Sequence, residues 1–402
     1  MIRMKIKTLI SLFILFIGCS QIVGCAHINN INNGAITKKR FDIQARWIKS
    51  LDNEDLLSFR KIHRFTPILF KDLVIQGNAF DKLSARRQVS GEEIWSLNIA
   101  NGIESSGVLA NKKIYFAALD GLVYSVDPED GKVAWTFNTK MENLSQPLVA
   151  EGKVFVLSGA NTLFALDAET GKQKWLYNRQ DSSSLSIRGG SKPVLHKGVL
   201  YTGFSDGALV ALDSSSGSLK WEKILNTNKK FRDLDFDPVV DEEKLYVGGF
   251  DDHLYVINLN SGDILWKYNA GVYGGLLVSG KLLYFGTTQG EFLAVQKEDG
   301  QKVWKESLEN RGIATTPIFH RGMVIYGESL GKLKFLDALT GKNIGSYEPG
   351  RGVFAAPVIK ENKLFFVSNE GLLYCLEFGW NSKSSIPWLE ASPATPKSST
   401  VK

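Results

Sequence analysis

The residue types that commonly do chemistry are scattered along this 402-residue chain. No Ser-His-Asp set, close pair of carboxylates or glycine-rich phosphate loop stands out. The histidines lack the short spacings of metal ligands; the five are His27, His63, His196, His253 and His320. Because His253 replaces the glycine of a repeated turn, we expect it to serve that turn. The sequence therefore predicts no enzymatic activity, no cofactor and no metal site.

The three cysteines cannot form a disulfide framework. Cys19 and Cys25 belong to an N-terminal leader, so only Cys375 remains for the folded body. Cys375 lies in a strand pattern, where we expect it to be a small buried apolar side chain.

The leader "MIRMKIKTLISLFILFIGCSQIVGCAH" has a basic start, an apolar run and then small residues, which is typical of a secretory signal. The apolar run, residues 8–18, is shorter than the roughly 20 residues that span a bilayer. "IVGC", ending at Cys25, resembles a bacterial lipobox, and "FIGC", ending at Cys19, is the alternative. We expect a signal peptide at 1–24 and a lipid-anchored polar tether at 25–40, or else an ordinary signal peptide cut elsewhere.

Composition indicates a globular body with a modest charge. The chain is 44% hydrophobic and 22% charged, and its formal charge is +6. Part of this charge lies in the leader and in the C-terminal segment 381–402, "NSKSSIPWLEASPATPKSSTVK", which we expect to be a disordered tail. The remaining charge is too small to predict nucleic-acid binding.

One phrase recurs with a period near 40 residues. It reads "DGLVYSVDPEDGKVAW" at 120–135, "NTLFALDAETGKQKW" at 161–175, "DGALVALDSSSGSLKW" at 206–221, "DHLYVINLNSGDILW" at 252–266, "GEFLAVQKEDGQKVW" at 290–304 and "GKLKFLDALTGKNIG" at 331–345. The tryptophans that close the copies, from Trp95 to Trp304, are 40, 40, 46, 45 and 38 residues apart. A period of this length indicates a propeller or a solenoid.

Each copy contains four short strand patterns separated by turn residues. In one copy these are "QPLVA" at 146–150, "KVFVLS" at 153–158, "TLFALD" at 162–167 and "KQKW" at 172–175. Four strands per period make a propeller blade. We expect the recurring tryptophans to pack between neighbouring blades, and Asp167 and Asp337 to form the Asp-x-x-Thr-Gly turns.

The two ends of the repeat region complete one another. A degenerate copy occupies residues 66–95, whereas the last copy, 356–378, stops after three strands. The missing fourth strand matches "FDIQARWIKSL" at 41–51, whose Trp47 takes the closing position. With Gly345 in the same position of its own copy, the count is eight. We therefore predict an all-β, eight-bladed propeller of four-stranded antiparallel blades at 41–380, with seven blades as the alternative.

Two consecutive connections between copies are longer than their counterparts. From the closing tryptophan to the next proline, 135 to 147 takes 12 residues and 304 to 317 takes 13, whereas 175 to 193 takes 18 and 221 to 238 takes 17; 47 to 67 takes 20 but crosses the proposed ring closure. They read "LYNRQDSSSLSIRGGSKP" (176–193) and "EKILNTNKKFRDLDFDP" (222–238), and neighbouring blades should place them side by side. We call five of their residues the docking patch: Leu185, Ile187, Arg188, Asp233 and Asp235.

An arginine with apolar neighbours beside two carboxylates is typical of a protein-binding hot spot. Loops carried on a rigid frame are also where binding residues gather. The alternative is that Arg188 pairs with Asp233 or Asp235 and only stiffens the propeller.

The repeat resembles that of quinoprotein dehydrogenases, which bind pyrroloquinoline quinone and calcium. That resemblance implies a vicinal disulfide against the cofactor, and this chain has no Cys-Cys pair. The lipobox, the eight copies, "LSIRGGSKPV" (185–194) and "DLDFDPVV" (233–240) together resemble the BamB family of bacterial outer-membrane lipoproteins. The alternatives are a quinone-dependent dehydrogenase and a periplasmic propeller for some other partner.

The BamB resemblance implies a non-enzymatic scaffold of the complex that inserts β-barrel proteins into the outer membrane. It implies that the docking patch binds a periplasmic POTRA domain of BamA, and that other subunits of the complex lie nearby. It also implies a lipid anchor in the outer membrane and a body facing the periplasm. The strand edges at the rim offer a site where nascent outer-membrane proteins could add a strand, which crosslinking of client segments to the rim would test.

Overall fold

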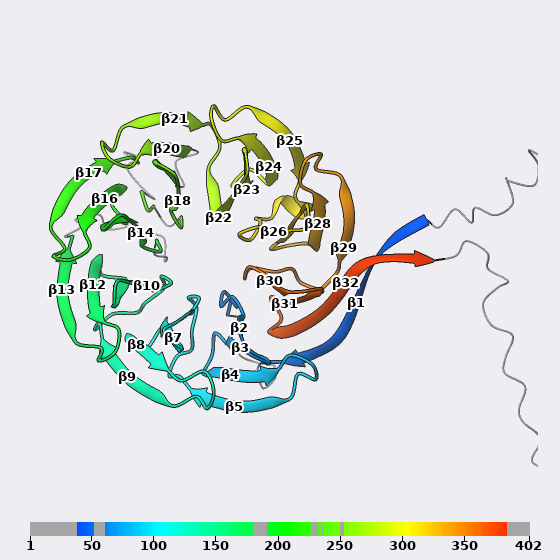
Figure 1. The fold of residues 1–402 in the computed structure, drawn as a ribbon, viewed down its shortest axis with the longest axis horizontal. Coiled ribbons are helices and arrows are strands. Elements are labelled where there is room, and N and C mark those ends of the chain that lie inside the picture. Colours follow the sequence, from blue (N-terminus) through cyan, green and yellow to red (C-terminus); the bar gives the residue numbers. More distant parts are fainter. Residues whose placement is uncertain are drawn as a thin grey trace, which may run out of the picture. The chain divides into compact units, whose positions relative to one another are not determined.

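The computed structural model describes residues 38–51, 61–179, 191–226, 232–234, 236–249 and 253–383. These residues form eight four-stranded sheets that follow one another around a ring (Figure 1). The prediction of an all-β, eight-bladed propeller is confirmed, and the seven-bladed alternative was wrong. A single 3-10 turn, η1 (Glu309–Arg311), is the helical element among these residues.

The first four blades run in chain order. Blade 1 contains β2 (Ile68–Phe70), β3 (Leu73–Gly77), β4 (Lys82–Arg87) and β5 (Glu93–Asn98). Blade 2 contains β6 (Val108–Ala110), β7 (Lys113–Ala117), β8 (Leu122–Val126) and β9 (Val133–Asn138). Blade 3 contains β10 (Leu148–Ala150), β11 (Lys153–Leu157), β12 (Thr162–Asp167) and β13 (Gln173–Asn178). Blade 4 contains β14 (Val194–His196), β15 (Val199–Gly203), β16 (Ala208–Asp213) and β17 (Leu219–Ile224).

The remaining blades complete the ring. Blade 5 contains β18 (Val239–Asp241), β19 (Lys244–Gly248), β20 (Leu254–Asn258) and β21 (Ile264–Tyr268). Blade 6 contains β22 (Val272–Ser279), β23 (Leu282–Thr287), β24 (Glu291–Gln296) and β25 (Lys302–Ser307). Blade 7 contains β26 (Ile318–His320), β27 (Met323–Gly327), β28 (Leu333–Asp337) and β29 (Asn343–Tyr347). Blade 8 contains β30 (Val358–Lys360), β31 (Lys363–Val367), β32 (Leu372–Lys383) and the N-terminal strand β1 (Lys38–Ser50).

Burial within a blade follows the position of the strand. The second and third strands are buried along almost their whole length, as in β11, where four of five residues are buried. The fourth strand alternates half-buried with exposed residues, as in β13, because only one of its faces meets another blade. This strand also runs three residues past Trp175, farther than the sequence pattern indicated.

The hydrophobic core lies between blades rather than within them. The cluster around Tyr115 and Val123 of blade 2 also contains Val154 and Phe164 of blade 3. Every other cluster of buried residues in the described part of the ring is likewise shared by two neighbouring blades.

The recurring tryptophans of seven blades pack against a turn of the next blade, which confirms their predicted role. A Cβ on Gly131 (φ +74°) would lie 2.6 Å from the Trp95 ring, so the positive-φ turn glycine gives the indole its place. Six indole N–H groups donate to carbonyl groups of the following blade at 3.0–3.2 Å: Trp47 to Gln88, Trp95 to Pro128, Trp135 to Ala168, Trp175 to Ser214, Trp221 to Leu259 and Trp304 to Ala338.

The aspartate turns are also confirmed. The Asp167 carboxylate accepts the N–H and the hydroxyl of Thr170, both at 2.9 Å, and Asp337 binds Thr340 in the same way. The Lys174 ammonium, 3.0 Å away, and these Thr170 donors lower the pKa of Asp167 to about 2. An aspartate in this turn therefore stays ionised and keeps the hairpin closed.

The N-terminal strand closes the ring as predicted. β1 pairs with β32, although the two strands stand at opposite ends of the sequence. Trp47 lies over the turn of Gly91 in blade 1, and Arg46 forms an ion pair with Glu377 of β32 at 2.5 Å. Blade 8 therefore joins the beginning of the described chain to its end.

The outer ends of β1 and β32, residues 38–42 and 379–383, form a compact unit of their own, separate from the ring of residues 43–378. In this small unit the Asn381 amide donates to Asp42 at 2.7 Å, and the Phe41 and Trp380 rings lie 5.2 Å apart. Residues 384–402 of the expected tail, and the leader and tether up to residue 37, lie outside the described residues.

Gly345 occupies the tryptophan position of blade 7, as predicted: it is paired with Phe335 just as Trp175 is paired with Ala165. Blade 8 has no hairpin turn to receive an indole, because its third and fourth strands are not consecutive in the chain. Instead Phe378 of β32, 5% exposed, packs its ring 5.3 Å from Phe335. An aromatic side chain from the next blade thus fills this junction from the opposite direction.

Candidate partner-binding surface and central cavity

The two long connections join neighbouring pairs of blades. Residues 179–193 lead from β13 to β14, and residues 225–238 lead from β17 to β18. Of the docking patch, Leu185, Ile187, Arg188 and Asp235 lie outside the described residues, as do Cys19 and Cys25 of the leader. Only Asp233 of the patch can be placed.

The described ends of the two connections are hydrogen-bonded to one another. Ser191 donates its hydroxyl to the carbonyl of Phe236 at 3.1 Å, and the N–H of Lys192 donates to the Asp237 carboxylate at 3.0 Å. These bonds confirm that the two connections lie side by side where the structure describes them.

Asp233 is buried on the inner side of its connection. Asp233 and its neighbour Leu234 are each 1% exposed. The N–H of Leu234 donates to the carbonyl of Phe204 in blade 4 at 3.2 Å, which ties the segment to the blade beneath it. A carboxylate buried in this way is costly unless other groups compensate its charge.

Arg179 anchors the other end of the first connection, a role that the sequence interpretation missed. Its guanidinium forms ion pairs with Asp206 at 2.5 Å and Glu222 at 2.8 Å, and lies 6.0 Å from the centroid of the Phe204 ring. Burial opposes the charge, but the two carboxylates outweigh it and raise the pKa of Arg179. The only signal in the sequence is an arginine near the start of the connection, and nothing local to it indicates its partners.

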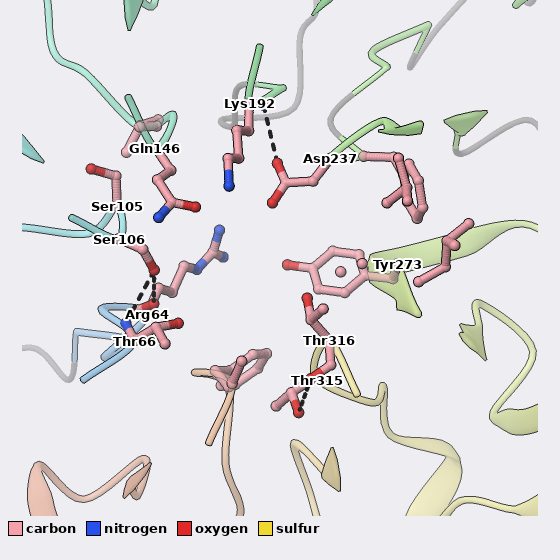
Figure 2. Close-up of a pocket in the computed structure, with 18 of the residues that line it drawn as sticks. Arg64, Thr66, Ser105, Ser106, Gln146, Lys192, Asp237, Tyr273, Thr315 and Thr316 are labelled. Atoms are coloured by element: carbon pink, nitrogen blue, oxygen red, sulfur yellow. Dashed lines mark hydrogen bonds between the residues drawn. The ribbon is translucent and has the colours of Figure 1, made fainter. Parts of the chain in front are cut away.

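A cavity of about 590 Å³ lies at the centre of the ring, and all eight blades or the connections leading into them contribute to its lining. Figure 2 shows polar side chains from several blades directed into this space, among them Arg64, Gln146, Lys192 and Tyr273. Lys192 and Asp237 line the cavity and also stand at the ends of the two long connections. Local sequence patterns do not predict this cavity, because its lining comes from the first strands of separate copies and the segments before them.

The residues that could support redox or metal chemistry are dispersed in the described part of the chain. No three His, Cys, Asp or Glu side chains there are grouped to hold a metal ion. Burial raises the pKa of the Cys375 thiol to about 11, as expected for a small core residue. Neither a cysteine nor a tryptophan lines the cavity. The residues present do not fit a quinone–calcium site.

The prediction that His253 replaces a turn glycine was wrong by one residue. His27 lies outside the described residues, and His63 is buried in blade 1. Strand pairing aligns Leu254 with Leu209, so His253 corresponds to Ala208 rather than to the turn glycine Gly207.

No helix in the described ranges is long and apolar enough to cross a membrane.

Eight blades with shared cores, tryptophan fastening and two extended neighbouring connections define a β-propeller scaffold with one specialised face. Residues 78–306 match the family model described as outer membrane protein assembly factor BamB. The BamB protein of Kangiella koreensis is 33% identical over 376 residues, which cover 91% of this chain and 96% of that protein. The chain therefore belongs to the BamB family.

Other comparisons agree in fold. An alignment with BamB of Legionella pneumophila, 28% identical, spans about half of each protein, 47% of this chain and 51% of the other. The crystal structure of BamB from Moraxella catarrhalis superposes with a TM-score of 0.72 at 20% identity, covering 84% of this chain and all of that one. The quinohemoprotein alcohol dehydrogenase of Comamonas testosteroni has a TM-score of 0.68 at 15% identity, over 86% of this chain and 78% of that one, and this likeness concerns the fold alone.

Proposed function

We propose that this protein is a lipid-anchored scaffold that assists the assembly of outer-membrane proteins and binds a POTRA domain of BamA through its docking patch. Membership in a family named for outer-membrane protein assembly supports this role. The single observation that carries the binding site is the hydrogen bonding between the ends of the two long connections. It brings the bases of both patch segments together.

Within this proposal the patch residues have different tasks. Leu185 and Ile187 supply apolar contact, and Arg188 supplies bidentate hydrogen bonds to the partner. Asp233, buried beside the frame, orients the loop, and Asp235 accepts bonds from Arg188 or from the partner. Arg179 fixes the point where the first segment leaves β13. The lipid on Cys25, or on Cys19, holds the scaffold at the periplasmic face of the outer membrane.

The test is binding of the wild-type chain to the POTRA region of BamA from the same organism, beside Arg188→Ala. Truncating a hot-spot arginine typically costs about 2 kcal/mol or more of binding, so the affinity should fall at least about thirtyfold. Arg351→Ala is the matched control, because Arg351 is exposed on the equivalent connection between β29 and β30, four blades away.

Each result has a defined meaning. Retained affinity in Arg351→Ala with a loss in Arg188→Ala supports both the partner and the patch. Equal binding by wild type and Arg188→Ala removes Arg188 from the site. If folded wild-type protein does not bind at all, the partner is wrong, and a periplasmic propeller for a different protein becomes the better interpretation.

A further inference from the structure

The central cavity contains two cationic side chains that form no ion pair within the described part of the protein. Arg64, on the segment before β2, and Lys192, before β14, both line the cavity, and Figure 2 shows both directed into it. Neither forms an ion pair in the described part of the chain, and the Nε atom of Arg64 is buried without a hydrogen-bond partner. A buried guanidinium N–H without an acceptor is costly.

The acidic groups of the cavity do not neutralise these cations directly. Glu104 and Asp237 are the carboxylates of the lining. Asp237 accepts the backbone N–H of Lys192 at 3.0 Å rather than its ammonium group. Burial raises the pKa of Asp237, which weakens the negative charge opposite Arg64 and Lys192. The cavity wall thus has cationic hydrogen-bond donors in Arg64 and Lys192, and an acceptor near them in Asp237.

The rest of the wall supplies neutral hydrogen-bonding groups. Gln146 is fixed by its amide donating to the carbonyl of Gly107 at 2.9 Å, which leaves its oxygen toward the cavity side chains. The Tyr273 ring and Thr316 also line the space. A volume of about 590 Å³ lies within the range of small-molecule sites, roughly 300–1,000 Å³.

We propose that the central cavity binds a small hydroxylated carboxylate, whose carboxylate group is held by Arg64 and Lys192. The hydroxyl groups of the ligand bond to Asp237, Gln146 and Thr316. Guanidinium and ammonium groups bind a carboxylate in different ways, the first as a flat fork and the second as a point charge. This site shares Lys192 and Asp237 with the bases of the two long connections, but it contains none of the docking-patch residues and its existence does not rest on the proposed function.

Calorimetric titration of the full chain with gluconate tests the proposal, with sorbitol and acetate as paired probes at one fixed ionic strength. Sorbitol has the hydroxyl groups of gluconate without the carboxylate, and acetate has the carboxylate without the hydroxyls. We expect gluconate to bind at least about tenfold more tightly than either. Equal heats for gluconate and sorbitol overturn the proposal, because they show that the cations do not act.

Variants locate the binding. Arg64→Gln and Lys192→Gln should each weaken gluconate binding about tenfold or more, and Arg64→Lys should restore part of the loss. Lys281→Gln, on the exposed turn between β22 and β23, is the control and should leave binding unchanged. If circular dichroism shows that Arg64→Gln does not fold, the test rests on whether Lys192→Gln weakens gluconate binding about tenfold or more. Unchanged affinity in the folded cavity variants places the ligand elsewhere and overturns the assignment.

Discussion

At the residue scale, Glu328 is the clearest electrostatic cost in the ring. It is fully buried in blade 7, where one carboxylate oxygen accepts the N–H of Glu309 at 3.1 Å. The other oxygen has no hydrogen-bond partner in the described structure, and the Lys334 ammonium is 3.9 Å away. Burial therefore raises the pKa of Glu328, in spite of that N–H bond and of Lys334, which lower it.

This shift gives stability a defined pH dependence. The unfolded chain ionises Glu328 at a lower pH than the folded chain does, so ionisation favours unfolding. The cost is absent below the unfolded pKa and fully present above the raised folded pKa. In urea unfolding, Glu328→Gln should become more stable relative to wild type as the pH rises from 4 to 8. Glu298→Gln, at a largely exposed site, is the control; a constant difference for Glu328→Gln would contradict the assignment.

Also at this scale, the sequence suggested the residues of the proposed docking patch but not the contacts that hold the two connections. Arg188 stood out because its segment is longer than its counterparts. Arg179 did not, because its partners Asp206 and Glu222 lie 27 and 43 residues away and meet it only when blades 3 and 4 are adjacent. The cavity pair Arg64 and Lys192 is farther apart still. Long-range juxtaposition of charges is decided by ring geometry, which local patterns do not contain.

At the element scale, the junction of blades 7 and 8 departs from the repeat for a reason set by ring closure. Phe378 occupies the position that Ala338 holds in blade 7, since its N–H donates to Asn362 as that of Ala338 does to Gly322. In a hairpin this position precedes a turn, whereas β32 continues as a strand. The large side chain there leaves no room for an indole at Gly345.

Restoring the consensus tryptophan should therefore harm the protein. Gly345→Trp places a large ring against Phe378 and Phe335, and overpacking of this kind typically costs about 1–3 kcal/mol of unfolding free energy. Denaturant unfolding should show a lower midpoint for Gly345→Trp. In a Phe378→Ala background, which supplies the missing space, Gly345→Trp should lower the midpoint by less than it does in the wild type. A higher midpoint for Gly345→Trp alone would contradict this, because it would show that the junction has room for an indole.

Most of the element pattern was accessible from the sequence because one copy explains the others. The Trp175 position, the Asp167 turn and the strand order all repeat, so eight weak signals support one another. The strand limits were less certain, since β13 extends beyond Trp175 and β32 extends to Lys383. At these places hydrogen bonding continues where the hydrophobic alternation has ended.

At the scale of the whole molecule, the clusters of buried residues in the described part of the ring are shared between neighbouring blades. One of them joins Ile75 and Leu83 of blade 1 to Phe116 of blade 2. A linear repeat protein can fray from its terminal units. In this ring the first and last parts of the chain share blade 8 and the cluster of Trp47, Val74 and Phe365. We therefore expect tryptophan fluorescence and far-UV circular dichroism to report one coincident unfolding transition.

Trp47 is the residue on which this cooperativity most depends, because it fastens the closing strand to blade 1. Trp47→Ala removes its packing on Gly91 and its 3.0 Å bond to Gln88, a loss that typically costs about 3–5 kcal/mol. Trp380→Ala is the matched control, since Trp380 is 55% exposed in the separate unit formed by the ends of β1 and β32. The control should keep the wild-type midpoint. With the closure weakened, the terminal blades become frayed ends, and amide hydrogen exchange in β2–β5 and β30–β32 should accelerate before exchange in β14–β21. Uniform acceleration around the ring would show instead that the blades unfold together even without the closing contact, and that cooperativity resides in the shared cores alone.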